Sequence, residues 1–313
     1  MTRTFRIATR QSKLALTQTQ QVIDAIKTHV PDFQYELVKI TSDGDEEKNP
    51  GDLKKIGGKG LFIKALEQAI LDEKADFAVH SMKDVPTDEE LPKGLIIPAA
   101  MQRADRRDVA VCRKDFIDFS ALTKGCVVGT SSPRREAQIK AFFPDLTVKP
   151  IRGNIDTRLK KLDRGDFDAI LLAKAGMDRV NLNARITDVF EPDMIMPALG
   201  QGTVGMECRD DDKETINLLA KINHKNTFTC LSAERAMLNT LGGDCFTPVA
   251  GYCEVTKGGH LRFIAMVISA DGQTVFRARH KMSYTQAEKL GKAVAKDLLS
   301  QGAADIIKQA SAA

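Results

Sequence analysis

A carboxylate and a lysine stand side by side in the stretch DFAVHSMKDVP at residues 76–86, just after a short apolar run. The run Phe77–Val79 predicts a buried strand, so Lys83 and Asp84 would follow the carboxyl end of that strand. In open α/β sheets ligands bind outside the carboxyl ends of the strands, and an isolated carboxylate there is a candidate for acid–base chemistry. A surface turn with a local ion pair is the alternative that this stretch leaves open.

Cations follow other predicted strand ends. The sequence GTSSPRR at residues 129–135 puts hydroxyl groups, Arg134 and Arg135 at the start of a helix, which suits an anion. The sequence IRGNIDTR at residues 151–158 repeats this arrangement with Arg152 and Arg158, and Arg179 follows a further strand. Each arginine alone reads as a solvated surface charge, but arginines after successive strands would converge on one cleft. The pattern predicts a polyanionic ligand, and the lack of a GK[ST] loop leaves carboxylates as good a candidate as phosphates.

A cysteine in a glycine-bearing turn is the third candidate. The sequence LGGDCFTP at residues 241–248 contains Cys245, which is either a structural cysteine or a thiol that serves as a nucleophile or an attachment point. The remaining cysteines, at positions 112, 126, 208, 230 and 253, form no CxxC pair and no zinc spacing. We therefore predict no metal site and no disulfide framework, and we expect most of the cysteines to be reduced and buried.

Alternating strands and helices must position these residues, which is typical of a mostly parallel sheet covered by helices. Strands are predicted at residues 5–8, 35–40, 77–79, 95–100 and 108–112, with a helix capped by Ser12 and another from 61 to about 73. A second series has strands at 126–128, 146–151 and 169–173, a helix ending at 143 and a helix at 154–162. The segment 202–208 is a strand that returns to the first series.

The composition changes from about residue 213. Two helices, the second at 228–241, precede three antiparallel strands near 249–255, 260–269 and 274–282, and one amphipathic helix from 286 to about 309 closes the chain. We expect three domains in the 313 residues: domain 1 at 1–101 and 202–220, domain 2 at 102–201, and domain 3 at 221–313. Lobes that are joined by two crossings usually bind a ligand between them.

Composition restricts the class of protein. Hydrophobic residues make up 42% of the chain and charged residues 28%, as in soluble globular proteins, and no stretch has the length of a membrane span. The first twenty residues lack the apolar core of a signal peptide, so we expect a cytoplasmic protein. The net charge of +4, the absence of Trp and the 3 Tyr argue against a dedicated nucleic-acid binder.

Several collinear stretches together resemble the porphobilinogen deaminase family, also called hydroxymethylbilane synthases. They are RIATRQSKLAL, GGKGLF, DFAVHSMKDVP, VGTSSPRR, RGNIDTRLKKLD, PALGQGTVGMECR and AERAMLNTLGGDCFTP, followed by the predicted βββα tail. The resemblance runs in order from Arg6 almost to the C-terminus. Such an ordered set is far more specific than any one of its members.

The resemblance implies a transferase of tetrapyrrole (haem) biosynthesis that polymerises four porphobilinogen molecules, with loss of ammonia, to hydroxymethylbilane. Growth would occur on a dipyrromethane cofactor that is joined through a thioether to Cys245, with Asp84 as the catalytic acid. The implied fold is α/β, with two similar doubly wound lobes resembling periplasmic binding proteins and a small α+β C-terminal domain with a three-stranded antiparallel sheet. The implied protein is a cytoplasmic monomer without metal, nucleic-acid or membrane partners.

The chemistry that the resemblance implies agrees with the residue types. Loss of ammonia from an aminomethylpyrrole leaves a cation, which a carboxylate such as Asp84 stabilises while it also moves protons. Besides Cys245, the implied cofactor-binding residues are Ser12, Lys83, Thr130, Ser131, Arg134, Arg135 and Arg158. The implied substrate-binding residues are Arg10, Lys55, Lys59, Phe62, Arg152, Arg179 and Gln201. The long polar loop at 41–60 would be a lid.

Two positions depart from the family pattern, and one of them, Pro133 within SSPRR, is benign because its fixed φ suits the first turn of a helix. Asp244 precedes Cys245 where members of the family commonly have glycine. A neighbouring carboxylate disfavours the thiolate and repels an acidic cofactor, so we expect Asp244→Gly to load the cofactor at least as fast as the parent.

Two other functions stay open on the sequence alone. One is a two-lobed anion-binding protein without catalysis, which release of ammonia from porphobilinogen would exclude. The other is an RNA-binding protein, which a gel shift at physiological salt would test.

Overall fold

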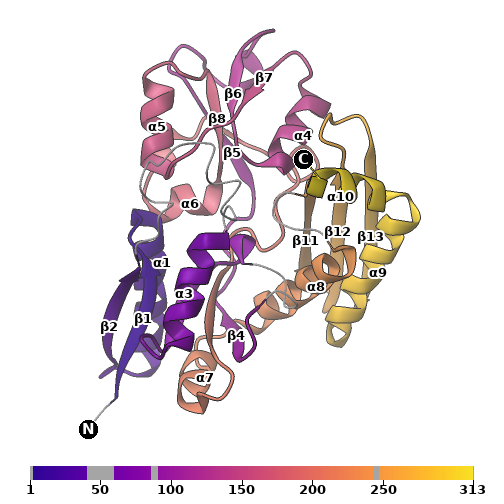
Figure 1. Cartoon of the computed structure of the whole chain (residues 1–313). Coiled ribbons are helices and arrows are strands. Elements are labelled where there is room, and N and C mark those ends of the chain that lie inside the picture. Colours follow the sequence, from indigo (N-terminus) through magenta and orange to yellow (C-terminus); the bar gives the residue numbers. More distant parts are fainter. Residues whose placement is uncertain (1–2, 41–59, 86–90, 243–246, 313) are drawn as a thin grey trace. The chain divides into compact units, whose positions relative to one another are not determined.

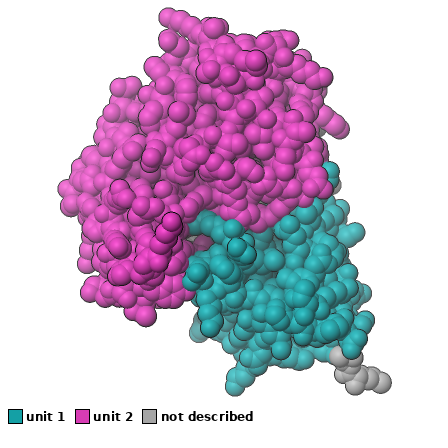
Figure 2. All heavy atoms as spheres, turned by 180° about the vertical axis from the view of Figure 1, so that it is seen from behind, with its two compact units in different colours: residues 1–103, 203–228 teal, residues 104–202, 229–313 magenta. Residues whose placement is uncertain are grey.

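The structure is a computed structural model that describes residues 3–40, 60–85, 91–242 and 247–312 (Figure 1). The chain divides into two compact units, residues 1–103 with 203–228 and residues 104–202 with 229–313, coloured separately in Figure 2. Within the described ranges no helix has both the length and the apolar character needed to cross a membrane.

The first unit is built on a five-stranded sheet with the strand order β2-β1-β3-β10-β4. Its strands are β1 (Thr4–Arg10), β2 (Gln34–Ile40), β3 (Phe77–Ser81), β4 (Leu95–Ala100) and β10 (Val204–Arg209). Strand β1 pairs in parallel with β2 and β3, whereas β10 lies antiparallel between β3 and β4. The prediction that the segment after residue 202 returns to the first sheet is therefore confirmed.

Helices cover both faces of the first sheet. Helix α1 (Lys13–His29) begins at Ser12, whose side chain accepts a hydrogen bond from the backbone N–H of Ala15, as the sequence predicted. Its residues Val22, Ile23 and Ile26 pack on one face of the sheet. Helix α3 (Gly60–Leu71) packs on the opposite face, and the short helix α7 (Lys213–Ala220) follows β10. Side chains alternate between the two faces along each strand, so the core under α1 is separate from the core under α3.

The second unit contains a five-stranded sheet with the order β7-β6-β8-β5-β9. Its strands are β5 (Asp108–Cys112), β6 (Val127–Gly129), β7 (Thr147–Lys149), β8 (Ala169–Ala173) and β9 (Asp188–Val189). Its helices are α4 (Pro133–Phe142), α5 (Ile155–Asp163) and α6 (Lys174–Arg179). Strand β7 is shorter than the predicted 146–151, and proline occupies the first position of α4, where its fixed φ fits a helix.

The same unit also holds a three-stranded antiparallel sheet, β11 (Val249–Val255), β12 (His260–Ile268) and β13 (Val275–Ser283). Helices α8 (Lys225–Leu241), α9 (Ala287–Ser300) and α10 (Ala303–Ala312) accompany this sheet. The prediction of one helix from 286 to about 309 is wrong, because the chain breaks between α9 and α10 at Gly302. The φ of Gly302 is 108°, a conformation that residues with a Cβ rarely adopt.

Apolar contacts join the two sheets of the second unit. Ala137 on α4 and Met196 pack with Ala250, Tyr252 and Met266 of the antiparallel sheet. This shared core explains why residues 104–202 and 229–313 form one compact unit. The division of the chain into three domains stays a prediction. The predicted fold class is confirmed, since two α/β sheets with the same pattern of parallel and antiparallel pairing are accompanied by a three-stranded antiparallel sheet with helices.

Candidate functional site

Asp84 lies on a short turn that the first sheet fixes by its backbone. Strand β3 ends at Ser81 and continues as a 3₁₀ helix, Met82–Asp84, in which Lys83 and Asp84 are half-buried. The backbone N–H of Met82 donates to the carbonyl of Thr203 over 3.0 Å. A Cβ at Gly205 would stand 2.1 Å from the sulfur of Met82, so glycine at that position makes room for the buried methionine. The turn thus presents Asp84 at the carboxyl end of β3, as the sequence predicted.

Two further candidate residues follow the neighbouring strand β1. Arg10 is its last residue and is half-buried, and Ser12 caps α1 with an Oγ to N distance of 3.3 Å from Ala15. Because β1 and β3 are parallel neighbours, Arg10 and Ser12 lie at the same edge of the sheet as Asp84. Ser12 Oγ accepts a bond as the helix cap, so a hydrogen bond from Ser12 to a ligand would be donated by its hydroxyl.

In the second unit, Arg134 and Arg135 form a buried cluster with Asp108. Arg134 Nη1 lies 2.6 Å from Asp108 Oδ2, and Arg135 Nη2 lies 2.7 Å from Asp108 Oδ1. Gln201 Nε2 donates to the same carboxylate over 2.9 Å. Burial alone would raise the pKa of Asp108, but the charges and hydrogen bonds of the two arginines hold it well below its ordinary value. Asp108 is therefore an anion that organises the start of α4.

The arginine cluster changes the interpretation of two predicted site residues. The sequence left open whether Arg134 and Arg135 are solvated surface charges or converge on a ligand cleft, and exposed fractions of only 4% and 5% contradict the first alternative. Two guanidinium groups share one carboxylate, which leaves the cluster with one net positive charge. The Nε–H of Arg134 is also buried and has no hydrogen-bond partner among the described residues. The cluster therefore contains a structural ion pair and one positive charge that the carboxylate does not neutralise.

The hydroxyl groups of the GTSSPRR stretch are engaged with the backbone around them. Thr130 is buried, and its Oγ1 accepts from the backbone N–H of Ser132 over 3.2 Å. Ser131 is exposed, and its hydroxyl donates to the carbonyl of Ile151 over 2.8 Å. These bonds tie the end of β6 to the segment after β7.

Three more arginines follow strands of the second sheet. Arg152 is exposed just after β7. Arg158 Nε donates to the carbonyl of Gly153 over 2.8 Å, and Arg179 Nη2 donates to the carbonyl of Gly202 over 2.9 Å. Strands β7, β6 and β8 are parallel neighbours, so the segments that carry Arg152, Arg158 and the Arg134 cluster follow one edge of the sheet.

Some predicted residues cannot be placed. Lys55, Lys59, Asp244, Cys245 and most of the predicted lid at 41–60 lie outside the described residues. Phe62 belongs to α3, but its side chain is not among those described. The roles of these residues, like those of the other predicted site residues, stay predictions.

The described cysteines are free thiols, and most of them are buried. All five are free, and all but Cys126 are buried, which agrees with the prediction. Burial raises the pKa of Cys112 to about 11 and that of Cys208 to about 12, so both stay protonated at neutral pH. In the part of the chain that the structure describes, no group of three or more His, Cys, Asp or Glu side chains could hold a metal ion.

Three ionisable residues that the sequence analysis missed contribute to these arrangements. Asp108 gave a weak signal, as a single carboxylate at the start of the apolar strand DVAVC. Glu207 lies within β10 and pairs with His80 of β3 at 2.8 Å. A charged residue in the middle of an apolar strand is the signal that could have indicated a buried partner.

A carboxylate on a fixed turn and a buried cluster with excess positive charge define an α/β protein suited to acidic ligands. The chain belongs to the porphobilinogen deaminase family. Residues 5–217 match the domain described as "Porphobilinogen deaminase, dipyromethane cofactor binding domain", and residues 228–300 match "Porphobilinogen deaminase, C-terminal domain". Membership makes the protein a transferase of tetrapyrrole biosynthesis with a dipyrromethane-binding domain, and it confirms the resemblance.

Curated relatives match over almost the whole chain. The porphobilinogen deaminase of Brevibacillus brevis is 43% identical over 305 residues, which cover 97% of this chain and 97% of the relative. The porphobilinogen deaminase of Bacillus subtilis is 42% identical over 308 residues, which cover 98% of this chain and 96% of the relative.

Solved structures are similar at a lower level. The methionine-binding protein MetQ superposes with a TM-score of 0.45 at 10% identity, over 72% of this chain and 92% of that chain. A probable amino-acid ABC transporter extracellular-binding protein of Bacillus subtilis gives a TM-score of 0.40 at 11% identity, over 71% and 90%. At these scores the likeness carries no argument about function.

Proposed function

We propose that this chain is a hydroxymethylbilane synthase, which joins four porphobilinogen molecules with loss of ammonia on a dipyrromethane held by Cys245. The observation that carries the proposal is Asp84, which stands half-buried on a backbone-fixed turn at the carboxyl end of β3, inside the region that matches the cofactor-binding domain. Family membership supplies the substrate class, and the turn supplies the reacting group.

In this proposal Asp84 stabilises the positive charge that forms on the substrate pyrrole. As ammonia leaves the aminomethyl group, the pyrrole becomes cationic, and a nearby carboxylate that accepts the pyrrole N–H stabilises this charge. Partial burial strengthens the interaction, because less water screens the charges. The same carboxylate takes up and returns the protons that the coupling releases and consumes. The fixed turn of β3 keeps Asp84 from reorganising during the reaction.

The described residues fit an acidic dipyrromethane. The cluster of Arg134 and Arg135 carries one net positive charge, and the buried Nε–H of Arg134 is a donor without a described partner. We assign Arg134, Arg135, Arg158, Lys83, Ser12, Thr130 and Ser131 to this cofactor, with Cys245 as its covalent anchor. When bound, the dipyrromethane supplies the pyrrole end to which the first substrate is joined. Asp108 and Gln201 position the arginines, since both bond within the cluster.

The other cations bind the carboxylates that accumulate as the chain grows. Each porphobilinogen brings an acetate and a propionate group, so the product carries many negative charges. We assign the substrate carboxylates to Arg10, Arg152, Arg179, Lys55 and Lys59, with Phe62 against a pyrrole ring and Gln201 beside them. Guanidinium groups suit this task because they bind carboxylates through two parallel hydrogen bonds.

We further propose a cytoplasmic monomer that acts without nucleic acid or membrane. The mild net charge of +4 supports only the absence of a nucleic-acid partner. Light scattering during gel filtration measures the monomer directly, and a dimer would contradict it.

The function is tested by weighing the intact protein and by measuring ammonia. We expect the purified chain to exceed its sequence mass by two pyrrole units and to release ammonia from porphobilinogen. The Cys245→Ser variant should lack the excess, whereas the matched control Cys126→Ser, which changes the part-exposed cysteine among those described, should keep it. An excess that persists in Cys245→Ser contradicts the anchor. Absence of ammonia release from a protein that carries the excess contradicts the reaction.

A further inference from the structure

Three ionisable side chains that the proposed reaction does not use lie buried together in the first unit. They are Glu67 on α3, His80 on β3 and Glu207 on β10, with exposed fractions of 4%, 5% and 0%. In the sheet, Gly205 is paired with His80 and Glu207 with Ala78, so His80 and Glu207 project from neighbouring strands to one face. Helix α3, which carries Glu67, packs on β1, β3 and β10. We call these three residues the Glu67 cluster.

The Glu67 cluster combines two carboxyl groups with a single imidazole. His80 Nε2 lies 2.8 Å from Glu207 Oε2, which makes a buried pair. Glu67 Oε1 and Glu207 Oε1 are also buried, and neither has a hydrogen-bond partner among the described residues. If His80 is charged, two carboxylates face one cation. The cluster is neutral only when one carboxyl group keeps its proton, and an unpaired buried charge is costly.

Three arginines lie on the strands against which α3 packs, and two of them have partners outside the Glu67 cluster. On β1, Arg6 pairs with Asp76 at 2.9 Å, and Arg10 lies half-buried at the end of the strand. On β10, Arg209 donates to the carbonyls of Ile70 and Ala75 over 2.8 Å and 3.1 Å.

The groups nearest to Glu67 set its protonation. Burial raises the pKa of Glu67 to about 7, and the charge of Glu207 adds to this effect. His80 and the exposed Lys64 on α3 itself oppose it. Glu67 therefore keeps its proton to a higher pH than an ordinary glutamate does.

We propose that protonated Glu67 is a positioning residue that keeps α3 seated on β3, and that loss of this proton loosens the end of β3 and its Asp84 turn. Ionised Glu67 and Glu207 would both be buried negative charges, and they would repel each other across the contact between α3 and the sheet. His80 lies two residues before Met82, the anchored residue of the turn, so a shift at His80 reaches Asp84 along the backbone. The inference rests on the proposed role of Asp84.

The sign of the pH effect follows from the direction of the shift. The pKa of Glu67 is higher in the folded chain than its ordinary value of 4.5. Folding is therefore favoured by protonation of Glu67, and this contribution is lost as the pH rises from that value through about 7. Glutamine at this position keeps the shape and the neutral state at every pH.

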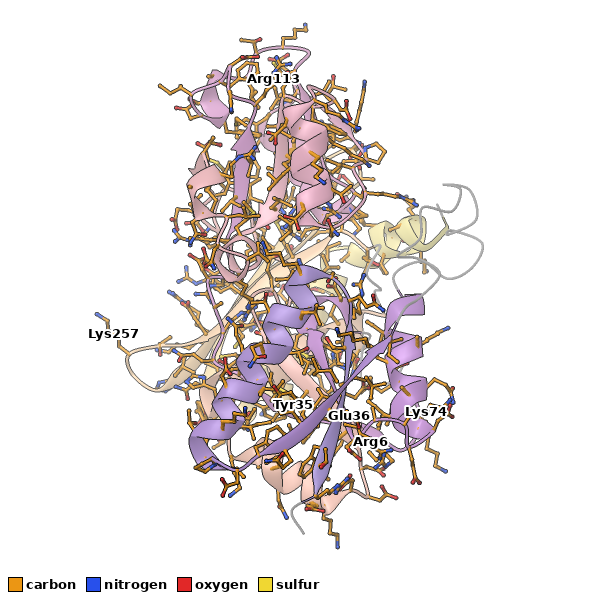
Figure 3. All side chains as sticks on the ribbon, turned by 90° about the vertical axis from the view of Figure 1, so that its left-hand side faces the viewer. Arg6, Tyr35, Glu36, Lys74, Arg113 and Lys257 are labelled. Atoms are coloured by element: carbon orange, nitrogen blue, oxygen red, sulfur yellow. The ribbon has the colours of Figure 1, made fainter. Side chains whose placement is uncertain are left out.

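The test compares the parent with Glu67→Gln and with the matched control Glu36→Gln. Glu36 is exposed on the edge strand β2, where Figure 3 labels it. We expect the ratio of kcat of Glu67→Gln to kcat of the parent to rise on the order of tenfold from about pH 6 to about pH 8, because roughly a tenth of Glu67 stays protonated one unit above its pKa. The ratio for Glu36→Gln should stay constant. A purely structural Glu67 would give a ratio that does not change with pH, and that result overturns the proposal.

A second readout does not depend on turnover. Infrared spectra of the parent should show the C=O band of a protonated carboxyl group at about pH 6 that loses half of its intensity near pH 7 and most of it by about pH 8, and Glu67→Gln should lack this band. A parent without the band overturns the proposal, even if the variant fails to fold. If the band titrates as expected but porphobilinogen is not consumed, the proposed function fails while the proton on Glu67 stands.

Discussion

The two five-stranded sheets share one pattern of strand pairing. They differ in the residues at the start of one helix that packs on each sheet. In each, three parallel strands are followed by one antiparallel strand and a last strand at the edge. The first residue of the antiparallel strand faces the last residue of the third parallel strand. In the first sheet Val204 faces Ser81, and in the second sheet Asp108 faces Ala173.

Helices α1 and α4, which follow the strands in the second place of each sheet order, β1 and β6, match this difference. Helix α1 begins after Ser12 with Lys13, Leu14 and Ala15, and α4 begins after Ser132 with Pro133, Arg134 and Arg135. Arg134 and Arg135 thus stand at the positions equivalent to Leu14 and Ala15, and Asp108 stands at the position equivalent to Val204. The comparison teaches that one scaffold accepts buried cations at a helix start when the antiparallel strand supplies their carboxylate. The helix start of the second sheet therefore carries a net positive charge. The corresponding place in the first sheet has apolar residues, and Asp84 lies at the carboxyl end of the neighbouring strand β3.

The largest effect is expected for Asp84→Asn, which tests whether the first sheet carries the chemistry. The amide cannot balance the developing positive charge or take up a proton, so kcat should fall by about 10²- to 10⁴-fold. The free energy of unfolding should change by less than about 1 kcal/mol, because the side chain is half-buried. Asp32→Asn, at an exposed position before β2, should keep full activity. Near-normal kcat in Asp84→Asn would place the chemistry elsewhere.

The next effect concerns the carboxylate of the second sheet. Asp108→Asn leaves two buried guanidinium groups without an anion, so urea unfolding should show a loss of about 3–5 kcal/mol. The triple variant Asp108→Val, Arg134→Leu, Arg135→Ala copies the first sheet. It should recover most of this stability, because apolar residues often replace buried ion clusters without loss. The same triple variant should purify without its dipyrromethane mass. A triple variant that retains this mass would show that the cluster is structural only.

The smallest effect distinguishes the two equivalent glutamines, Gln18 and Gln138, which stand six residues after the serine that precedes each helix. Gln138 donates to the carbonyls of Arg134 and Met196 and accepts from the N–H of Met196 over 2.7 Å. Gln18 has one such bond, a donation to the hydroxyl of Ser81 over 2.7 Å. In urea unfolding, Gln138→Leu should therefore lower the free energy of unfolding by about 1–3 kcal/mol, and Gln18→Leu should lower it by about 1 kcal/mol. Equal costs would mean that the extra bonds of Gln138 add nothing.

The strand and helix pattern was predictable because it depends on neighbours in the sequence. Apolar runs and caps such as Ser12 act within one turn or one strand, and the predicted strands of both sheets are present. The break at Gly302 was missed because the apolar spacing continues across it, with Leu298 before it and Ile306 after it in one core. A single glycine in such a pattern is a weak signal for a break.

The site was predictable only in part, for a physical reason. Asp84 stands directly after an apolar run, so its place at a strand end could be derived locally. Asp108 lies 26 residues from Arg134, and His80 lies 127 residues from Glu207, so these contacts depend on how the sheets assemble. Burial of Arg134 and Arg135 follows from the partner Asp108, which no local pattern reveals.

The position of β10 has a consequence for the order in which the chain is completed during synthesis. Strand β4 lies at the edge of its sheet and pairs only with β10, which is made after the whole second sheet. The second sheet, by contrast, uses strands from one continuous segment, residues 108–189, and can close first. The turn of Asp84 is anchored through Met82 to Thr203. Asp84, the proposed catalytic carboxylate, is therefore made within the first third of the chain, yet its turn is anchored only after about two thirds of the chain has been synthesised.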